Sequence, residues 1–251
     1  MKAKFITFEG IDGAGKSTLV NHLVNIYRGQ GEKVFYFSPS DIVKNLTIET
    51  DININFQTRD DIIYSSKKVL DTLSTLKQAP TANNYNKLMI NYFKFMKVYS
   101  GVIQKYLDEG YFIIADRWYH SSIAYNNIVS GTIINKLYES SNFDLNSIED
   151  TNIKSIKKLL DETLLPDYTF LIDIDIKTAM NRIKEREMKT CILRDKTFED
   201  ENKLLRVHNT YLKMLGTSYI KPFCMLHKIE SNDSPFELVN KIYKIINNEV
   251  V

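Results

Sequence analysis

The chain has little cysteine, little net charge and no long apolar run. Its two cysteines, Cys191 and Cys224, have no metal-ligand spacing and cannot form a disulfide framework, so we expect reduced thiols, which fits a cytoplasmic protein. The net charge of +2 gives no reason to expect a nucleic-acid partner. The chain does not open with a basic stretch followed by a long apolar one, so we expect neither a signal peptide nor a membrane span.

What remains is the composition of an ordinary globular protein. With 251 residues, 43% of them hydrophobic and 25% charged, the chain can bury a substantial core as one α/β domain. Short β-branched or aromatic runs alternate with amphipathic stretches of helix length, which is typical of a parallel sheet with crossover helices. The predicted strands are residues 5–9, 33–37, 111–115, 168–173 and 223–229. The predicted helices are residues 16–28, 85–107, 176–187, 198–215 and 235–247.

Two stretches, residues 44–86 and 126–161, are richer in Asn, Ser, Thr and Asp than the rest of the chain. Neither carries enough apolar pattern to bury a core of its own. We therefore expect a single domain over residues 1–251, from which these two stretches depart as polar excursions.

A complete phosphate-binding loop follows the first predicted strand. Residues 10–17 read Gly-Ile-Asp-Gly-Ala-Gly-Lys-Ser. Glycines let successive backbone N–H groups curl around a phosphate, Lys16 reaches the β- and γ-phosphates, and Ser17 offers its hydroxyl to Mg²⁺. The following helix points its positive end at the ligand. The predicted nucleotide site comprises Gly10, Asp12, Gly13, Ala14, Gly15, Lys16, Ser17 and Thr18.

Two charged residues end the third predicted strand. Asp116 follows the apolar run, and Arg117 comes next. In a protein with a phosphate loop, this strand end is the usual place for the acid that organises Mg²⁺ and its waters, and a guanidinium fork suits a phosphate. Both residues would lie in the crevice at the carboxyl ends of the strands, where ligands bind. The alternative is a structural ion pair at a strand end.

Three blocks of the sequence, taken in order, resemble the thymidylate kinases. Residues 8–18 read FEGIDGAGKST, residues 116–126 read DRWYHSSIAYN, and residues 166–173 read PDYTFLID. The second block is similar to the family signature Asp-Arg-Tyr-x-x-Ser-x-x-Ala-Tyr-Gln. The resemblance implies a three-layer P-loop fold, in which helices flank a five-stranded parallel sheet and a short lid closes the site. It also implies transfer of the ATP γ-phosphoryl group to the 5′-phosphate of dTMP with Mg²⁺, commonly by a homodimer.

The resemblance implies roles for single residues of the first two blocks. Lys16 and Ser17 would hold the ATP phosphates and Mg²⁺, and Asp116 would order the waters of the metal. Arg117 would grip the acceptor phosphate. Asp12 would meet either a sugar hydroxyl of the acceptor or the metal.

The second block also supplies residues for the rest of the acceptor. Tyr125 stands where family members crowd the 2′ position of the sugar and so favour deoxyribose. Ser121 and Asn126 are assigned to acceptor binding, with Asn126 in place of the family's glutamine. Some relatives carry an arginine at the position of Gly13, and those that lack it draw a cation from the lid.

The basic stretch over residues 182–198 is the candidate lid. It contains Arg182, Lys184, Arg186, Lys189 and Arg194. Phosphoryl transfer requires positive charge around the equatorial oxygens and the exclusion of water, and a basic lid supplies both. Arg186 and Arg194 are the preferred catalytic cations. The alternative for each cation is a solvated surface charge.

The sequence departs from the family where the acceptor is recognised. After the second strand, relatives place an arginine beside a proline and a glutamate, whereas residues 37–40 here read Phe-Ser-Pro-Ser. Before the third strand, relatives have an aromatic that stacks on the base and an arginine one turn later. Phe93 would be the stacking residue and Lys97 the replacement for that arginine, although an aromatic stripe at helical spacing also fits core packing. Thymidylate specificity is therefore less secure than kinase activity.

Three functions remain open at this point. The first is a kinase of deoxynucleoside monophosphates that acts on dTMP. The second is a kinase of dUMP, of another pyrimidine monophosphate or of an unphosphorylated deoxynucleoside. The third is a nucleotide-binding regulator without an acceptor site. Asp116, Arg117 and the lid arginines argue against the third, because a mere binder needs no clamp for an acceptor phosphate.

Overall fold

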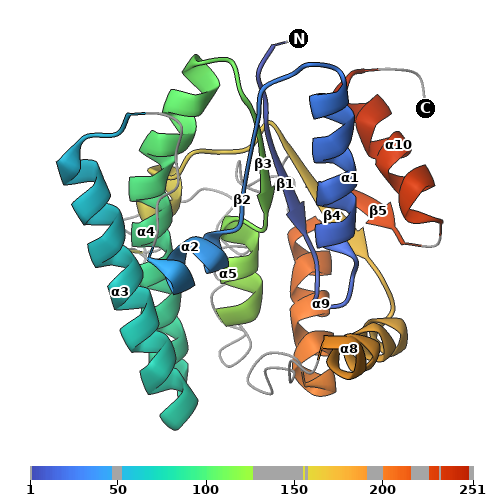
Figure 1. Cartoon of the computed structure of the whole chain (residues 1–251). Coiled ribbons are helices and arrows are strands. Elements are labelled where there is room, and N and C mark those ends of the chain that lie inside the picture. The colour runs from blue at the N-terminus through green and yellow to red at the C-terminus, as the bar shows by residue number, and fades with distance from the viewer. Residues whose placement is uncertain are drawn as a thin grey trace, which may run out of the picture.

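The computed structural model describes residues 2–46, 53–126, 155, 158–190, 200–215, 226–231 and 233–248. Strands and helices alternate along these segments (Figure 1). The strands are β1 (Phe5–Glu9), β2 (Val34–Phe37), β3 (Phe112–Asp116), β4 (Tyr168–Asp173) and β5 (Leu226–Glu230). The helices are α1 (Lys16–Gly29), α2 (Pro39–Asn45), α3 (Phe56–Gln78), α4 (Ala82–Asp108), α5 (Tyr119–Asn126), α8 (Ile176–Thr190), α9 (Glu201–Leu215) and α10 (Pro235–Ile246).

The sheet has five parallel strands in the order β2-β3-β1-β4-β5. Because all the strands run in the same direction, their carboxyl ends lie at one edge of the sheet, at the bottom of Figure 1. The register decides which loops become neighbours there. Phe8 of β1 lies opposite Asp116 of β3, so the phosphate loop and the segment after Asp116 leave the sheet side by side.

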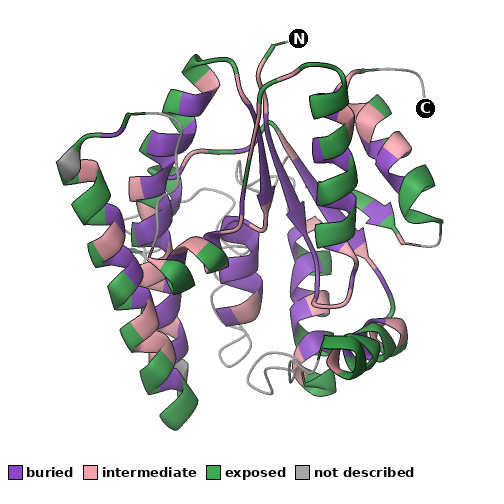
Figure 2. Ribbon diagram, viewed as in Figure 1, coloured by how far each residue is buried: buried purple, intermediate pink, exposed green. Residues whose placement is uncertain are grey.

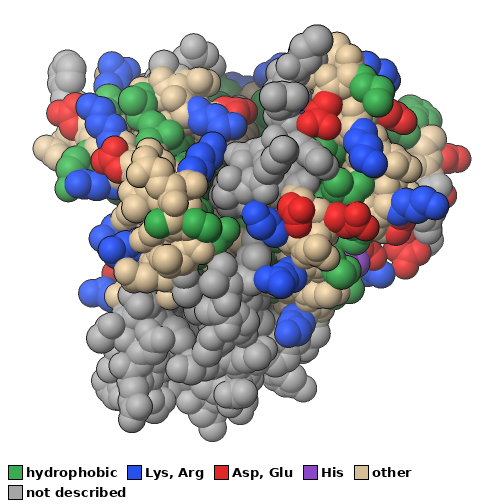
Figure 3. All heavy atoms as spheres, turned by 90° about the horizontal axis from the view of Figure 1, so that it is seen from below, with side chains coloured by type: hydrophobic (Ala, Val, Ile, Leu, Met, Phe, Trp, Pro, Cys, Tyr) green, Lys and Arg blue, Asp and Glu red, His purple; other side chains and the backbone are tan. Residues whose placement is uncertain are grey.

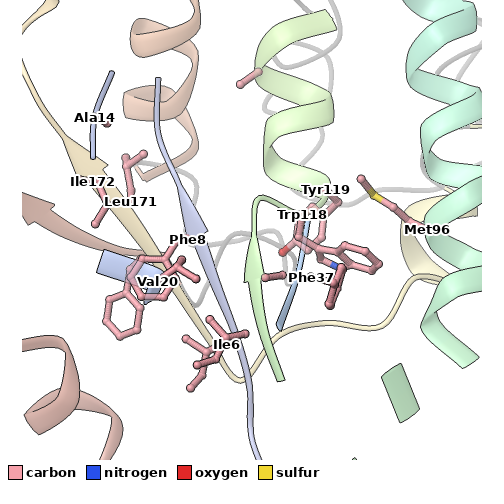
Figure 4. Packing of buried hydrophobic residues seen from close by; sticks show 14 of the residues in the cluster. Ile6, Phe8, Ala14, Val20, Phe37, Met96, Trp118, Tyr119, Leu171 and Ile172 are labelled. Carbon is pink, nitrogen blue, oxygen red and sulfur yellow. The ribbon is translucent and has the colours of Figure 1, made fainter. Parts of the chain in front are cut away.

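Helices cover the sheet and close its core. α1 packs against α10, while α4, α5 and α9 pack in series (Figure 1). Figure 2 shows that α5 is buried over most of its length, whereas α3 and α8 present exposed faces. Trp118 packs edge-on against Phe5 and Phe37, with ring centroids 5.6 Å and 5.8 Å apart. Figure 4 shows Trp118 and Tyr119 beside Phe37, with Met96 of α4 facing them.

The fold class predicted from the sequence is confirmed: helices flank a five-stranded, wholly parallel sheet. All five strands and the five long helices that we predicted are present, with ends shifted by a few residues. Residues 223–225 of the last predicted strand lie outside the described residues. Across the segments that are described, no helix has the length and apolar character needed to cross a membrane.

Among the described residues, the structure adds helices that the sequence analysis did not identify, including α2, α3 and α5. The largest of these, α3, occupies much of the first polar excursion. It buries Ile62, Val69 and Leu76, which are spaced by seven residues, and packs along α4. Most of the second excursion and residues 191–198 of the candidate lid lie outside the described residues.

Candidate active site

The phosphate loop leaves β1 in a conformation that only glycine accepts at two places. Gly10 and Gly13 have φ angles of 136° and 81°. A Cβ on Gly10 would lie 2.6 Å from the carbonyl oxygen of Ile172, and a Cβ on Gly13 would lie 2.4 Å from that of Ala179 in α8. The loop is therefore packed tightly between β4 and α8, and its backbone stays open toward a ligand.

Lys16 begins α1 at the end of this loop, and its side chain reaches back to the start of the loop. Its Nζ donates to the carbonyl oxygen of Ile11 at 2.9 Å, and the side chain is buried. Burial and the nearby Arg117 lower the pKa of Lys16 to about 8. An anionic phosphate in the loop would favour the charged form of this amine.

Ser17 and Asp116 form a pair of oxygen groups suited to Mg²⁺. Ser17 Oγ donates to Asp116 Oδ2 at 2.6 Å. The other carboxylate oxygen, Oδ1 of Asp116, is buried and has no hydrogen-bond partner among the described residues. The same part of the chain contains no group of three or more His, Cys, Asp or Glu side chains that could hold a metal ion. A hard cation here would thus take its remaining ligands from phosphate and water, as Mg²⁺ commonly does.

Arg117 lies between the phosphate loop and α5, and its backbone is left-handed with a φ of 76°. Its Nη2 pairs with Asp12 Oδ1 at 2.5 Å and donates to the Tyr125 hydroxyl at 3.1 Å, and its Nη1 donates to the carbonyl oxygen of Gly10 at 2.8 Å. The Tyr125 hydroxyl donates to Asp12 Oδ2 at 2.9 Å. Burial opposes ionisation of Asp12, but Arg117 and Lys16 hold the pKa of that carboxyl below its ordinary value.

Sequence reasoning gave no role to Glu9, the last residue of β1, although it belongs to the first family-like block. Glu9 is fully buried, and burial raises the pKa of its carboxyl above the ordinary range. Its carboxylate accepts hydrogen bonds from the Trp118 backbone N–H at 2.7 Å, from the Tyr211 hydroxyl at 2.9 Å and from Ser121 Oγ. No spacing in the sequence links Glu9 with Tyr211, which comes from α9.

Two cavities open at the carboxyl edge of the sheet. The first, which we call the loop cavity, has a volume of about 450 Å³ and surrounds the phosphate loop. Its lining residues are Asp12, Gly13, Gly15, Lys16, Ser17, Thr18, Ser38, Ser40, Asp41, Asp116, Arg117, Arg182 and Arg186. Figure 3 views the molecule from this edge, where described side chains of both charge signs face the viewer.

The second, which we call the helix cavity, has a volume of about 320 Å³ and lies among α2, α3, α4 and α5. Its lining residues are Asp12, Pro39, Ser40, Lys44, Leu73, Lys77, Leu88, Tyr92, Met96, Arg117, Trp118, Ser121, Ser122, Tyr125 and Asn126. The two cavities share Asp12, Ser40 and Arg117. A ligand in one cavity therefore meets a ligand in the other at these three residues.

Five of the predicted acceptor residues line the helix cavity: Asp12, Arg117, Ser121, Tyr125 and Asn126. Two others, Phe93 and Lys97, are not among its lining residues. Phe93 is fully buried in the core, and Lys97 forms a salt bridge with Glu162 at 2.8 Å instead of reaching the cavity. Because Phe93 and Lys97 each lie one position along α4 from a cavity residue, the turn of the helix points them elsewhere. The cavity receives Tyr92 and Met96 in their place.

The candidate lid cations are only partly described. Arg182 and Arg186 of α8 both line the loop cavity. Nη1 of Arg182 donates weakly to the carbonyl oxygens of Gly13 and Ala14, at 3.4 Å and 3.5 Å. Arg194, the other preferred cation, lies outside the described residues.

Comparisons with known proteins agree with this geometry. A family model described as thymidylate kinase matches residues 130–230. The thymidylate kinase of Thermosipho africanus is 26% identical over 216 residues, and the probable thymidylate kinase of Thermococcus kodakarensis is 29% identical over 216 residues; each match covers 84% of this chain and 83% of the relative. The thymidylate kinase of Wolbachia pipientis wMel is 31% identical over 186 residues, which are 72% of this chain and 73% of the relative. The chain belongs to the thymidylate kinase family.

The chain differs from the thymidylate kinase family at two places in its site. Ser38 and Ser40 line the loop cavity where the family resemblance leads us to expect a charged pair. Met96 lines the helix cavity one turn after Tyr92, whereas Lys97, the predicted replacement for the family's arginine, pairs with Glu162. Both changes remove charge from the part of the site that would face an acceptor.

Proposed function

We propose that the protein is a thymidylate kinase, which transfers the γ-phosphoryl group of ATP to the 5′-phosphate of dTMP and releases dTDP and ADP. The observation that carries the proposal is the wall of Asp12, Ser40 and Arg117 that the loop cavity and the helix cavity have in common. In-line transfer needs the donor and acceptor phosphates to meet at one point. Membership of the family supports dTMP as the acceptor.

On the donor side, the loop cavity would bind ATP. Backbone N–H groups of the loop and Lys16 Nζ would contact the phosphates, and the charge of Lys16 would act most strongly on the transferring group. Mg²⁺, when bound, would neutralise negative charge on the phosphates. Ser17 and Asp116 would hold the metal, and the unpartnered Oδ1 of Asp116 supports this assignment.

On the acceptor side, Arg117 would hold the 5′-phosphate of the nucleotide. Its terminal nitrogens already donate to Asp12, Tyr125 and the carbonyl oxygen of Gly10, so phosphate binding would replace part of the contact with Asp12. Asp12 would then be available to a sugar hydroxyl. Tyr125, which is fixed by both neighbours, would close the 2′ side of the sugar.

The cation that embraces the transferring phosphoryl group would come from α8. A side chain at position 13 would collide with the backbone of Ala179, so an arginine in the phosphate loop does not fit this structure. Arg182 and Arg186 line the loop cavity and are charged groups of the required kind. We assign the role to these two together with Arg194.

A second acceptor class is compatible with the same geometry. The α4 side of the helix cavity consists of Leu88, Tyr92 and Met96, which offer no charged group to a base. A kinase of another pyrimidine deoxynucleotide, such as dUMP, would fit the same cavity.

The proposal also includes a homodimer, a single domain over the whole chain and a cytoplasmic location. These three parts rest on the family resemblance and the composition.

A coupled assay that follows ADP formation tests the proposal. The acceptors are dTMP, dUMP, dCMP, thymidine and none, each with ATP and Mg²⁺. We expect the highest kcat/KM with dTMP and a background rate without an acceptor. Lys16→Ala should lower kcat by at least about 10²-fold, the scale of losing one preorganised charge at the transferring group. A folded Lys16→Ala protein with normal turnover, or a rate independent of the acceptor, would contradict the proposal.

A further inference from the structure

Arg117 is connected to the buried carboxylate of Glu9 through two hydroxyl groups. Its Nη1 donates to Ser121 Oγ at 3.1 Å and to the Tyr211 hydroxyl at 3.5 Å. Both hydroxyls in turn donate to Glu9 Oε2, Tyr211 at 2.9 Å. The side chains of Glu9 and Tyr211 are fully buried. A carboxylate without access to water needs such partners and a nearby cation.

Glu9 also holds the backbone next to Arg117. Arg117 has a left-handed φ of 76°, which is unfavourable for a residue with a Cβ. The backbone N–H of Trp118 donates to Glu9 Oε1 at 2.7 Å, and the backbone N–H of Arg117 donates to the carbonyl oxygen of Phe8 at 2.9 Å. Glu9 thus contacts the peptide that follows Arg117 with one oxygen and the hydroxyls beside its guanidinium with the other.

The third member of this network, Tyr211, belongs to a different part of the molecule. It lies on α9, which packs against both α5 and α8 (Figure 1). One turn earlier on the same helix, His208 Nε2 lies 2.5 Å from Asp173 Oδ1 at the end of β4. These contacts fix α9 relative to the sheet and bring the Tyr211 hydroxyl to Ser121 at 2.8 Å.

We infer that Glu9 and Tyr211 are positioning residues that aim Arg117 at the acceptor phosphate, and that α9 sets this aim through the Tyr211 hydroxyl. The inference rests on the proposed function, because it takes Arg117 as the group that holds the acceptor. Neither residue lines the helix cavity or the loop cavity. Their effect on the acceptor therefore passes through Arg117, which also donates to Ser121.

The first experiment measures the KM of each substrate for Tyr211→Phe. The variant keeps the buried ring and removes only the hydroxyl. We expect the KM of the acceptor to rise about tenfold, the scale of one hydrogen bond within a charged network, while the KM of ATP stays near that of the wild type. The matched control is Tyr99→Phe, which removes the hydroxyl of another buried tyrosine, on α4, whose ring packs on Phe95 and Phe37. It should change neither KM.

The second experiment repeats Tyr211→Phe in an Arg117→Ala background. If Tyr211 acts through Arg117, its effect on the kcat/KM of the acceptor disappears when Arg117 is absent. An equal loss in both backgrounds, or an unchanged KM of the acceptor in the single variant, overturns the inference. Glu9→Gln is measured alone and in the Arg117→Ala background in the same way, and its effect on the kcat/KM of the acceptor should also disappear when Arg117 is absent. This second variant keeps the test valid if Tyr211→Phe does not fold. A wild-type protein that phosphorylates no acceptor would instead refute the proposed function.

Discussion

Lys16 is a residue whose acid–base behaviour the fold has changed. Burial, with Arg117 nearby, lowers the pKa of its amine to about 8, below the value of a free lysine. Above that pH the free protein holds a neutral Lys16. A bound nucleotide phosphate restores the charge, so binding takes up a proton, and affinity falls by up to about tenfold for each pH unit above 8.

Calorimetry with a non-hydrolysable ATP analogue measures this linkage. Titrations at pH 9 in two buffers of different ionisation enthalpy should show proton uptake, whereas uptake at pH 7 should be close to zero. Lys16→Arg keeps a charge that does not titrate in this range and is the matched control. Equal uptake by the wild type and Lys16→Arg at pH 9 would assign the proton to another group.

Arg117 and Arg182 should affect different substrates. Arg117 lies in the wall shared by the two cavities, whereas Arg182 lines only the loop cavity. Arg117→Ala should weaken acceptor binding by about 10²-fold and change ATP binding little, because a charge-assisted contact with phosphate is lost. Arg182→Ala should lower kcat by at least about tenfold with acceptor affinity retained. Binding constants from calorimetry and steady-state kinetics separate these outcomes, and a reversed pattern would exchange the two roles.

Single residues differ in how far the sequence could place them. Residues of short blocks, such as Asp12, Ser17 and Arg117, are predictable because a loop or strand end fixes their position. On a long helix an error of one position turns a side chain by about 100°, which is why Phe93 proved to be a core residue and Tyr92 a cavity residue. Tyr211 is 202 residues from Glu9 in the chain, so no local sequence pattern could predict the hydrogen bond between them.

At the scale of elements, the contact between the phosphate loop and α8 is the tightest feature of the site. Gly13→Ala would place a Cβ 2.4 Å from Ala179 at a φ of 81°. We expect a loss of about 1–3 kcal/mol in the free energy of unfolding, together with weaker ATP binding, because either the loop or α8 must shift. Gly29→Ala is the control, since no heavy atom lies within 4 Å of the added Cβ. Denaturant unfolding measures the stability of both variants. A Gly13→Ala protein as stable as the Gly29→Ala protein would show that α8 shifts without cost.

The helix α3 shows where the prediction of elements failed. Its sequence is rich in Ser, Thr, Asp and Lys, which led us to interpret the stretch as a polar excursion. Yet Ile62, Val69 and Leu76 form a narrow apolar seam that α4 covers. Leu70 and Leu73 of the same helix are half-buried against the core. Polar residues separate these apolar positions, so the pattern is weak in the sequence, and the helix depends on its packing against α4. The strands β1, β2, β3 and β4 were easier to predict because each is a compact and largely apolar run between turn residues.

At the scale of the whole molecule, the site depends on how the sheet brings distant segments together. Parallel pairing of β1 with β3 sets the phosphate loop beside Asp116 and Arg117, and Ser17 of the loop is 99 positions from Asp116. Alternation of strands and helices made that neighbourhood predictable. The sequence could not show that two cavities meet there, because their walls come from α2, α3, α4, α5 and α8 in three dimensions.

The central claim is that the two cavities hold the donor and the acceptor of one phosphoryl transfer. The most direct test is calorimetric titration with a bisubstrate analogue that joins adenosine and thymidine through a polyphosphate. We predict one analogue per chain, bound more tightly than ATP or dTMP and displaced by either of them. Binding should weaken in both Lys16→Ala and Arg117→Ala. An analogue that competes with only one of the two substrates, or that is insensitive to Arg117→Ala, would contradict the account.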